Sequence, residues 1–263
     1  MTSPTIAPDT GTVRTDSANG IATISFHHPK GNSLPSAQLA RLAQAVDAAA
    51  ADDGARVVVL RSEGGGPFCA GASFAELQSI SARGDREAGR EFFMGFARLN
   101  LAMKRCPKMI VARVHGKAVG GGVGVVAAAD YPIAVRSASV RLSELAVGIG
   151  PFVVGPAIER KIGLGAFAAM AADADWRDAA WAERHGLYAQ LHDDAGAMDA
   201  AVAAAAERLA SSNPEAMRKL KAVFWEGTDD WDRLLAERAE MSGTLVLSAF
   251  TRNAISAFGA GAR

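Results

Sequence analysis

The sequence has few cysteines, no excess of either charge sign and no long apolar run. Its 263 residues carry 28 Lys+Arg against 28 Asp+Glu, with only two cysteines, Cys69 and Cys106. Balanced charge offers no broad positive surface, so we expect neither nucleic acid nor a membrane surface as a partner. No apolar stretch approaches the roughly 20 residues that span a bilayer. Two isolated cysteines fit a reducing compartment, and we expect a cytoplasmic protein.

Several common catalytic signatures are also missing. The chain contains no GxxxxGK[ST] phosphate loop, no HExxH motif, no paired CxxC and no GxSxG elbow. These absences argue against a P-loop nucleotide site, a zinc site and an α/β-hydrolase nucleophile. Any chemistry must therefore come from other features of the chain.

Strand and helix patterns alternate through most of the chain, which predicts an α/β protein. The expected strands cover residues 21–26, 57–60, 109–114 and 131–135. From about residue 197 only helical patterns follow. We therefore divide the chain into a flexible N-terminal tail (1–19), a core (20–196) and a C-terminal helical subdomain (197–263).

Phenylalanine recurs at helical spacing between residues 85 and 104. Phe92, Phe93 and Phe96 belong to a stripe that also includes leucine and methionine. Such a stripe is typical of a helix that faces the core, which is the commoner explanation, although it could also line an apolar pocket.

Glycine is concentrated where backbone groups would need to be exposed. Residues 70–72 (Ala-Gly-Ala) and 120–122 (Gly-Gly-Gly) each follow an expected strand. Small residues let a ligand oxygen approach backbone N–H donors, and two such loops could hold one developing oxyanion. The alternative is that these glycines only permit tight turns and close helix packing.

Glu144 is a lone carboxylate within an apolar stretch that ends at Phe152. Burial among apolar side chains raises the pKa of a carboxyl group and suits it to proton transfer near neutral pH. The alternative is a surface glutamate that caps a turn or pairs with Arg141.

In order and spacing, these segments resemble the crotonase superfamily, also called the enoyl-CoA hydratase/isomerase family. The resemblance rests on residues 68–72, 114–124 and 143–151 and covers most of the chain. It implies a crotonase-like spiral of β-β-α units with a C-terminal helical trimerisation region. The expected assembly is a homotrimer or a dimer of trimers.

The resemblance also implies a substrate and roles for individual residues. The substrate is an acyl-CoA, whose thioester oxygen would be held by the backbone N–H groups of Ala72 and Gly121 while Glu144 moves a proton. Coenzyme A enters as part of the substrate, and no metal or redox cofactor is required. Further contacts to coenzyme A would come from three residues, Lys30, Ala70 and Phe258.

The chain departs from the family pattern at the first of two glutamates that hydratases use. Gly124 stands at that position, so only Glu144 remains. One carboxylate can move a double bond by taking and returning a proton, which favours isomerisation of 3-enoyl-CoA to 2-enoyl-CoA. Hydration of a 2-enoyl-CoA, including branched or methylglutaconyl-like substrates, stays an alternative. Phe152 replaces an acid of dienoyl-CoA isomerases and argues against that reaction.

Two further alternatives come from other classes of protein. Residues 122–127 fit the GxGxxA pattern of dinucleotide-binding folds, with Glu144 about twenty positions further on. The chain could also be a non-catalytic, oligomeric acyl-CoA binder that has lost the acid at position 124.

Overall fold

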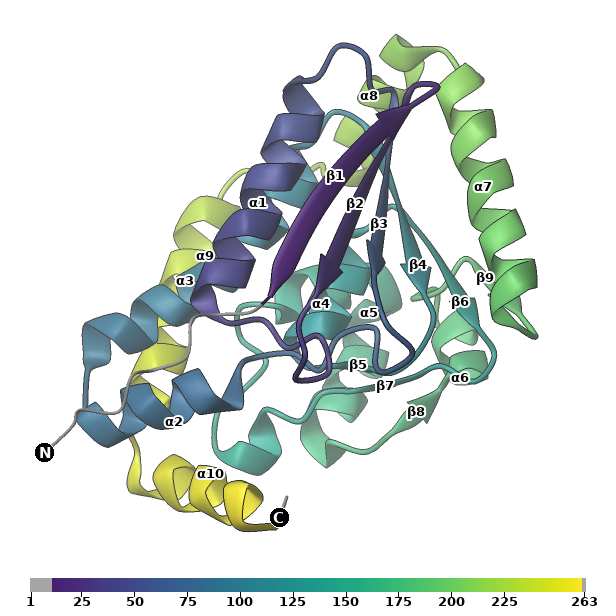
Figure 1. The fold of residues 1–263 in the computed structure, drawn as a ribbon. Coiled ribbons are helices and arrows are strands. Elements are labelled where there is room, and N and C mark those ends of the chain that lie inside the picture. Colours follow the sequence, from purple (N-terminus) through teal and green to yellow (C-terminus); the bar gives the residue numbers. More distant parts are fainter. Residues whose placement is uncertain (1–10, 262–263) are drawn as a thin grey trace, which may run out of the picture.

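A six-stranded sheet forms the centre of the protein, which we describe from a computed structural model covering residues 11–261, with side chains through residue 257. Its strand order is β1-β2-β3-β4-β6-β9 (Figure 1). Within this sheet, β1 and β2 pair antiparallel and all other neighbouring strands pair parallel. The strands are β1 (Thr12–Ala18), β2 (Ile21–His27), β3 (Val57–Ser62), β4 (Met109–Val114), β6 (Tyr131–Val135) and β9 (Gln190–His192).

The prediction of a flexible tail through residue 19 is wrong for its last part, because residues 12–18 form β1. This strand is mostly exposed and polar, so it carries no alternation of apolar residues that would reveal it. Asn19 and Gly20, both with positive φ, turn the chain into β2. Asn-Gly is a strong hairpin signal, and it was present in the sequence. Residues 1–10, which we also expected to belong to this tail, lie outside the residues that the structure describes.

Helices lie against the large sheet on two sides. In Figure 1, α1 (Ser36–Ala51) and α7 (Ala195–Ser211) flank it on opposite sides. The long helix α3 (Arg86–Arg105) packs between α1 and α9 (Trp231–Leu245). The buried face of α3 carries the phenylalanine stripe, which matches the expected helix over residues 85–104.

A short second sheet brings the site segments together. It consists of β5 (Ala118–Val119), β7 (Ser139–Arg141) and β8 (Arg177–Asp178). The buried helix α4 (Gly121–Ala128) follows β5, and a 3₁₀ turn, η1 (Leu145–Val147), follows β7. The glycine segment and Glu144 therefore leave neighbouring strands.

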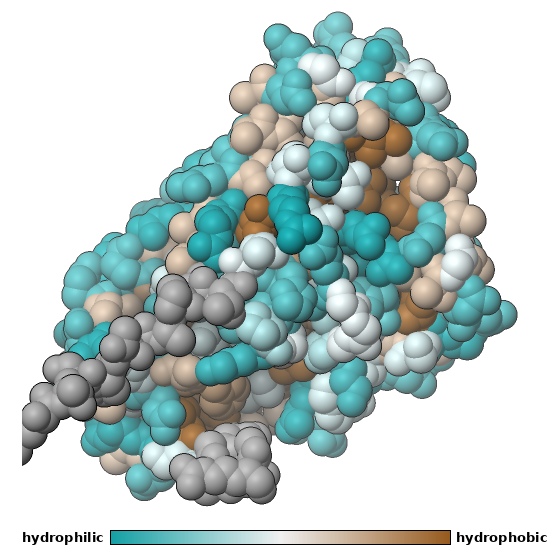
Figure 2. All heavy atoms as spheres, in the orientation of Figure 1, coloured by the Kyte–Doolittle hydropathy of each residue, from teal (hydrophilic) through white to brown (hydrophobic). Residues whose placement is uncertain are grey.

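The remaining helices complete an α/β fold with a helical C-terminal region, as expected. They are α2 (Phe74–Arg83), α5 (Gly155–Asp173), α6 (Ala179–Arg184), α8 (Pro214–Phe224) and α10 (Ala249–Gly261). Beyond β9 the described residues contain no strand. Hydrophilic side chains cover most of the face in Figure 2, and none of the described helices is both long and apolar enough to cross a membrane.

Candidate active site

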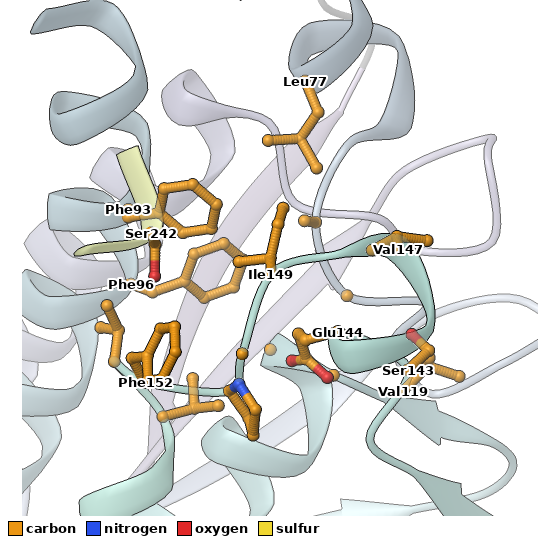
Figure 3. A pocket seen from close by; sticks show the side chains of 18 of the residues that line it. Leu77, Phe93, Phe96, Val119, Ser143, Glu144, Val147, Ile149, Phe152 and Ser242 are labelled. Carbon is orange, nitrogen blue, oxygen red and sulfur yellow. The ribbon is translucent and has the colours of Figure 1, made fainter. Parts of the chain in front are cut away.

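An apolar pocket opens between the two glycine-containing loops, α3 and the segment after β7 (Figure 3). Its cavity is about 60 Å³, which leaves room for a small group. Most lining side chains are apolar, and the polar ones are Ser143, Glu144 and Ser242. The apolar wall includes Phe74, Leu77, Phe93, Phe96, Val147, Ile149, Phe152 and Val154.

The loop of residues 70–72 is held tightly against the second glycine segment. Cys69 donates its N–H to the carbonyl of Lys117 (3.1 Å) and accepts from the N–H of Val119 (2.9 Å). Gly71 has a φ of +81°, and a Cβ there would lie 2.5 Å from the Val119 carbonyl oxygen. Only glycine allows this close approach of the two loops.

Two backbone donors at this junction have no acceptor within the part of the chain that the structure describes. They are the N–H groups of Ala72 and Gly121, and both residues line the pocket. Gly121 is the first residue of α4, so its N–H lies at the positive end of the helix dipole. Free donors from two loops can bind one carbonyl oxygen and stabilise negative charge that develops on it.

The carboxylate of Glu144 lies beside these donors. Gly120 has a positive φ, and a Cβ on it would meet Glu144 Oε1 at 2.8 Å, so a bulkier residue would displace the carboxylate. Figure 3 shows the side chain turned into the pocket. The backbone of Glu144 is fixed separately, because its carbonyl accepts from Val147 (3.2 Å) and Ile149 (2.9 Å).

Burial sets the electrostatics of this carboxylate. Glu144 Oε2 is shielded from solvent and has no hydrogen-bond partner among the described residues. Desolvation raises the pKa of Glu144 to about 7, and the backbone amides of Glu144 and Ser143 offset only part of that effect. Arg141 donates to the carbonyl of Ala174 (2.5 Å), and none of the described ion pairs joins it to Glu144. Glu144 is the N-cap residue of η1, but its side chain makes no capping hydrogen bond. The structure therefore supports neither form of the alternative, a side chain that caps a turn or one that pairs with Arg141.

The position of the missing glutamate is filled by another side chain. A Cβ on Gly124 would lie 2.5 Å from Cγ1 of Val154, which also lines the pocket. An acidic side chain at position 124 would need Val154 to move. Phe152 contributes a second apolar side chain to the same wall. The pocket therefore offers one carboxylate and no second acid.

The phenylalanine stripe of α3 serves both of the roles that the sequence left open. Phe93 and Phe96 line the pocket, whereas Phe92 belongs to the buried core. A Cβ on Gly121 would lie 2.1 Å from Cε1 of Phe96, so this ring packs directly against the second donor loop.

Two of the three residues expected to contact coenzyme A, Ala70 and Lys30, come from neighbouring loops of the structure. Ala70 lines the pocket, and its N–H donates to the carbonyl of Gly31 (3.0 Å). Lys30 is exposed on that neighbouring loop and does not line the pocket. Phe258 belongs to α10, but its side chain lies outside the described residues.

The glycines of the dinucleotide-binding pattern face protein atoms. A Cβ on Gly122 would lie 2.6 Å from the carbonyl oxygen of Cys69, and Gly124 faces Val154. All eight residues of α4 are buried. A pyrophosphate group has no room beside these glycines, which argues against the dinucleotide alternative. Within the described residues no cluster of His, Cys, Asp and Glu could hold a metal ion.

Two features of the pocket were not expected from the sequence. Val154 precedes α5, and Ser242 comes from α9, far along the chain from the other site residues. No local motif marks either residue, because each is identified only by the packing that brings it to the pocket. Together, the site defines a protein that can hold a carbonyl oxygen while a carboxylate moves a proton on an adjoining carbon.

Comparison with known proteins agrees with this class. The sequence pattern of the enoyl-CoA hydratase/isomerase family matches residues 16–257. A crotonyl-CoA hydratase of Syntrophomonas wolfei is 30% identical over 90% of this chain and 91% of its own length. The chain therefore belongs to the enoyl-CoA hydratase/isomerase family of enzymes, the crotonase superfamily.

Other relatives show how far the likeness extends. The crystal structure of an enoyl-CoA hydratase from Mycobacterium avium has a TM-score of 0.81 and 26% identity, covering 95% of this chain and 96% of that one. The chain spans about half the length of several curated relatives. One is a (7aS)-7a-methyl-1,5-dioxo-2,3,5,6,7,7a-hexahydro-1H-indene-carboxyl-CoA hydrolase of Mycobacterium tuberculosis, 35% identical over 49% of this chain and 51% of its own.

Proposed function

We propose that this protein isomerises a 3-enoyl-CoA to the 2-enoyl-CoA, with Glu144 as the single proton carrier. The observation that supports this most directly is a lone carboxylate, with Oε2 shielded from solvent, beside two backbone donors that have no acceptor among the described residues. The side of the pocket where a second acid would stand is filled by Val154. An isomerisation adds no atom to the substrate, so one group that alternates between two protonation states is sufficient.

The reaction proceeds through an enolate. The Glu144 carboxylate removes a proton from Cα, between the thioester and the double bond, and the electrons of that C–H bond pass to the thioester oxygen. The N–H groups of Ala72 and Gly121 hold this oxygen. The protonated Glu144 then gives its proton to Cγ, the carbonyl re-forms and the double bond now joins Cα and Cβ. Because its pKa is about 7, Glu144 can adopt both forms near neutral pH.

Hydration of a 2-enoyl-CoA is the second candidate. The name of the Syntrophomonas wolfei relative, crotonyl-CoA hydratase, favours it. This reaction needs a base for the water and an acid for Cα. In this pocket Glu144 would have to perform both steps.

Mass spectrometry of 3-hexenoyl-CoA and crotonyl-CoA incubated in D₂O distinguishes these reactions. Isomerisation predicts a shifted double bond in 3-hexenoyl-CoA, with deuterium incorporated and no water gained. Glu144→Gln should lower the rate by about 10² to 10⁴. Glu207→Gln is the matched control, because Glu207 is exposed on α7 away from the pocket.

Each other outcome has its own meaning. If crotonyl-CoA gains a water in a Glu144-dependent reaction, the protein is a hydratase. If both thioesters bind and are recovered unchanged, the non-catalytic alternative is correct. Equal rates for the wild type and Glu144→Gln would refute the role of this residue.

A further inference from the structure

Ser242 places a hydroxyl group in the apolar wall of the pocket. Its side chain is 1% exposed and lines the pocket together with Phe93 and Phe96. Figure 3 shows the hydroxyl beside these two rings, away from the Glu144 carboxylate. A group bound by the backbone donors and extending past Glu144 would therefore approach Ser242 with its distal part.

Ser242 presents its hydroxyl to the pocket, and its oxygen is not one of the fully shielded side-chain atoms that lack a partner. It makes no hydrogen bond to any described residue, although a helical serine can often bond to the carbonyl one turn earlier. A ligand that covers this hydroxyl without bonding to it leaves it unsatisfied, which lowers affinity. By contrast, buried Ser81 donates to the carbonyl of Val246 at 2.8 Å. Ser242 thus offers a ligand a hydrogen-bonding group at a place where an alanine would offer none.

Close helix packing holds Ser242 in place. The adjacent Gly243 faces α3, and a Cβ on it would lie 2.6 Å from the nitrogen of Arg90. A Cβ on Gly89 would in turn lie 3.1 Å from the Gly243 carbonyl oxygen. The two helix backbones therefore touch beside Ser242, which fixes the backbone position from which its side chain reaches the pocket before any ligand binds.

The charges around the pocket limit which ligand groups could bind to the Ser242 hydroxyl. None of the lining residues is Lys, Arg or His. A carboxylate on the ligand would be desolvated without a cation, beside the ionisable Glu144. A neutral oxygen, in contrast, can donate to or accept from the serine hydroxyl.

We infer that Ser242 is a specificity-determining residue that hydrogen-bonds a neutral oxygen, a hydroxyl or a ketone, carried by the acyl chain beyond Cβ. The inference rests on the proposed binding of an acyl-CoA in this pocket. It names the substrate class more narrowly, as short acyl chains with an uncharged oxygen substituent. Plain hydrocarbon chains would leave the hydroxyl unpaired, and chains that end in a carboxylate would bind worst.

Calorimetric binding of unreactive, saturated CoA thioesters tests this inference without depending on turnover. The ligands are hexanoyl-CoA, its 4-, 5- and 6-hydroxy derivatives, and the analogue that ends in a carboxylate. For wild type, at least one hydroxy derivative should bind about tenfold more tightly than hexanoyl-CoA. Ser242→Ala should remove this preference. Ser81→Ala, which loses a buried hydroxyl outside the pocket, should keep it.

Two results would overturn the inference while leaving the proposed function standing. One is that hexanoyl-CoA binds and no hydroxy derivative binds better. The other is that Ser242→Ala changes the affinity for every thioester by the same factor, as a purely structural serine would. If no thioester binds at all, the proposed function itself fails and the inference fails with it.

Discussion

The desolvated carboxylate of Glu144, whose Oε2 is shielded from solvent, should reduce the stability of the protein at alkaline pH, and glutamine at this position should restore it. Glutamine has nearly the same shape as glutamate but cannot ionise, so Glu144→Gln preserves the packing against Gly120. The variant therefore separates the electrostatic effect of the carboxylate from its steric effect.

The size of this effect follows from the pKa. Burial raises the pKa of Glu144 from 4.5 to about 7, so between these values the folded protein keeps a proton that the unfolded chain releases. Stability consequently falls as the pH rises from about 4.5 to 7 and stays low above that range. The full difference corresponds to about 3 kcal/mol at pH 8, where Glu144→Gln should be the more stable protein.

Urea unfolding at pH 4.5 and pH 8 measures this difference, with the protein concentration held constant so that assembly does not contribute. Relative to wild type, Glu144→Gln should gain stability between the two pH values. The exposed Glu207→Gln control should not. If both variants track the wild type at both pH values, the carboxylate is not desolvated, and the reasoning about its pKa is wrong.

Three other perturbations test separate parts of the structure. The kcat/KM of the isomerisation should rise with pH through an inflection near 7, because Glu144 must be ionised to take the first proton; a flat profile would contradict this. Gly71→Ala places a Cβ 2.5 Å from the Val119 carbonyl oxygen and should lower activity by about 10² to 10³, whereas unchanged kinetics would show that the donor loops are not coupled. Lys221→Ala removes the ion-pair partner (2.8 Å) of the buried Asp130 carboxylate, which keeps the N–H donor of Ile110 (2.7 Å). The loss should cost about 3–5 kcal/mol in urea unfolding, whereas a loss below 1 kcal/mol would refute a buried ion pair.

Most of the large sheet could be predicted from the sequence because its strands are buried. Residues 57–60 are a continuous apolar run, and residues 109–114 are apolar except for Arg113; these patterns are typical of buried parallel strands, and the residues form β3 and β4. β1 was missed because an exposed edge strand needs no apolar pattern. Its order comes from hydrogen bonds to β2, and the only local sign was the turn at Asn19 and Gly20.

The residues of the candidate site likewise fall into those that a local sequence pattern could reveal and those that it could not. Glu144 and the two glycine segments could be found because each has a local signature, an isolated acid or residues able to adopt positive φ. Val154 and Ser242 could not be found, because an ordinary valine and an ordinary serine gain their place only through long-range packing. Local sequence patterns therefore point to the groups that we propose react, but not to the side chains that form the pocket wall around them.

This wall bears directly on the choice between the two candidate reactions. If Gly124 had merely lost a carboxylate, its site would be an open space that water could occupy and that a single reversion could refill. Val154 instead stands 2.5 Å from where a Cβ would begin, and the helix that carries Gly124 is buried throughout. A second acid would need both a new side chain at position 124 and a smaller one at position 154. The packing of two helices, as well as the identity of one residue, thus supports chemistry with one carboxylate.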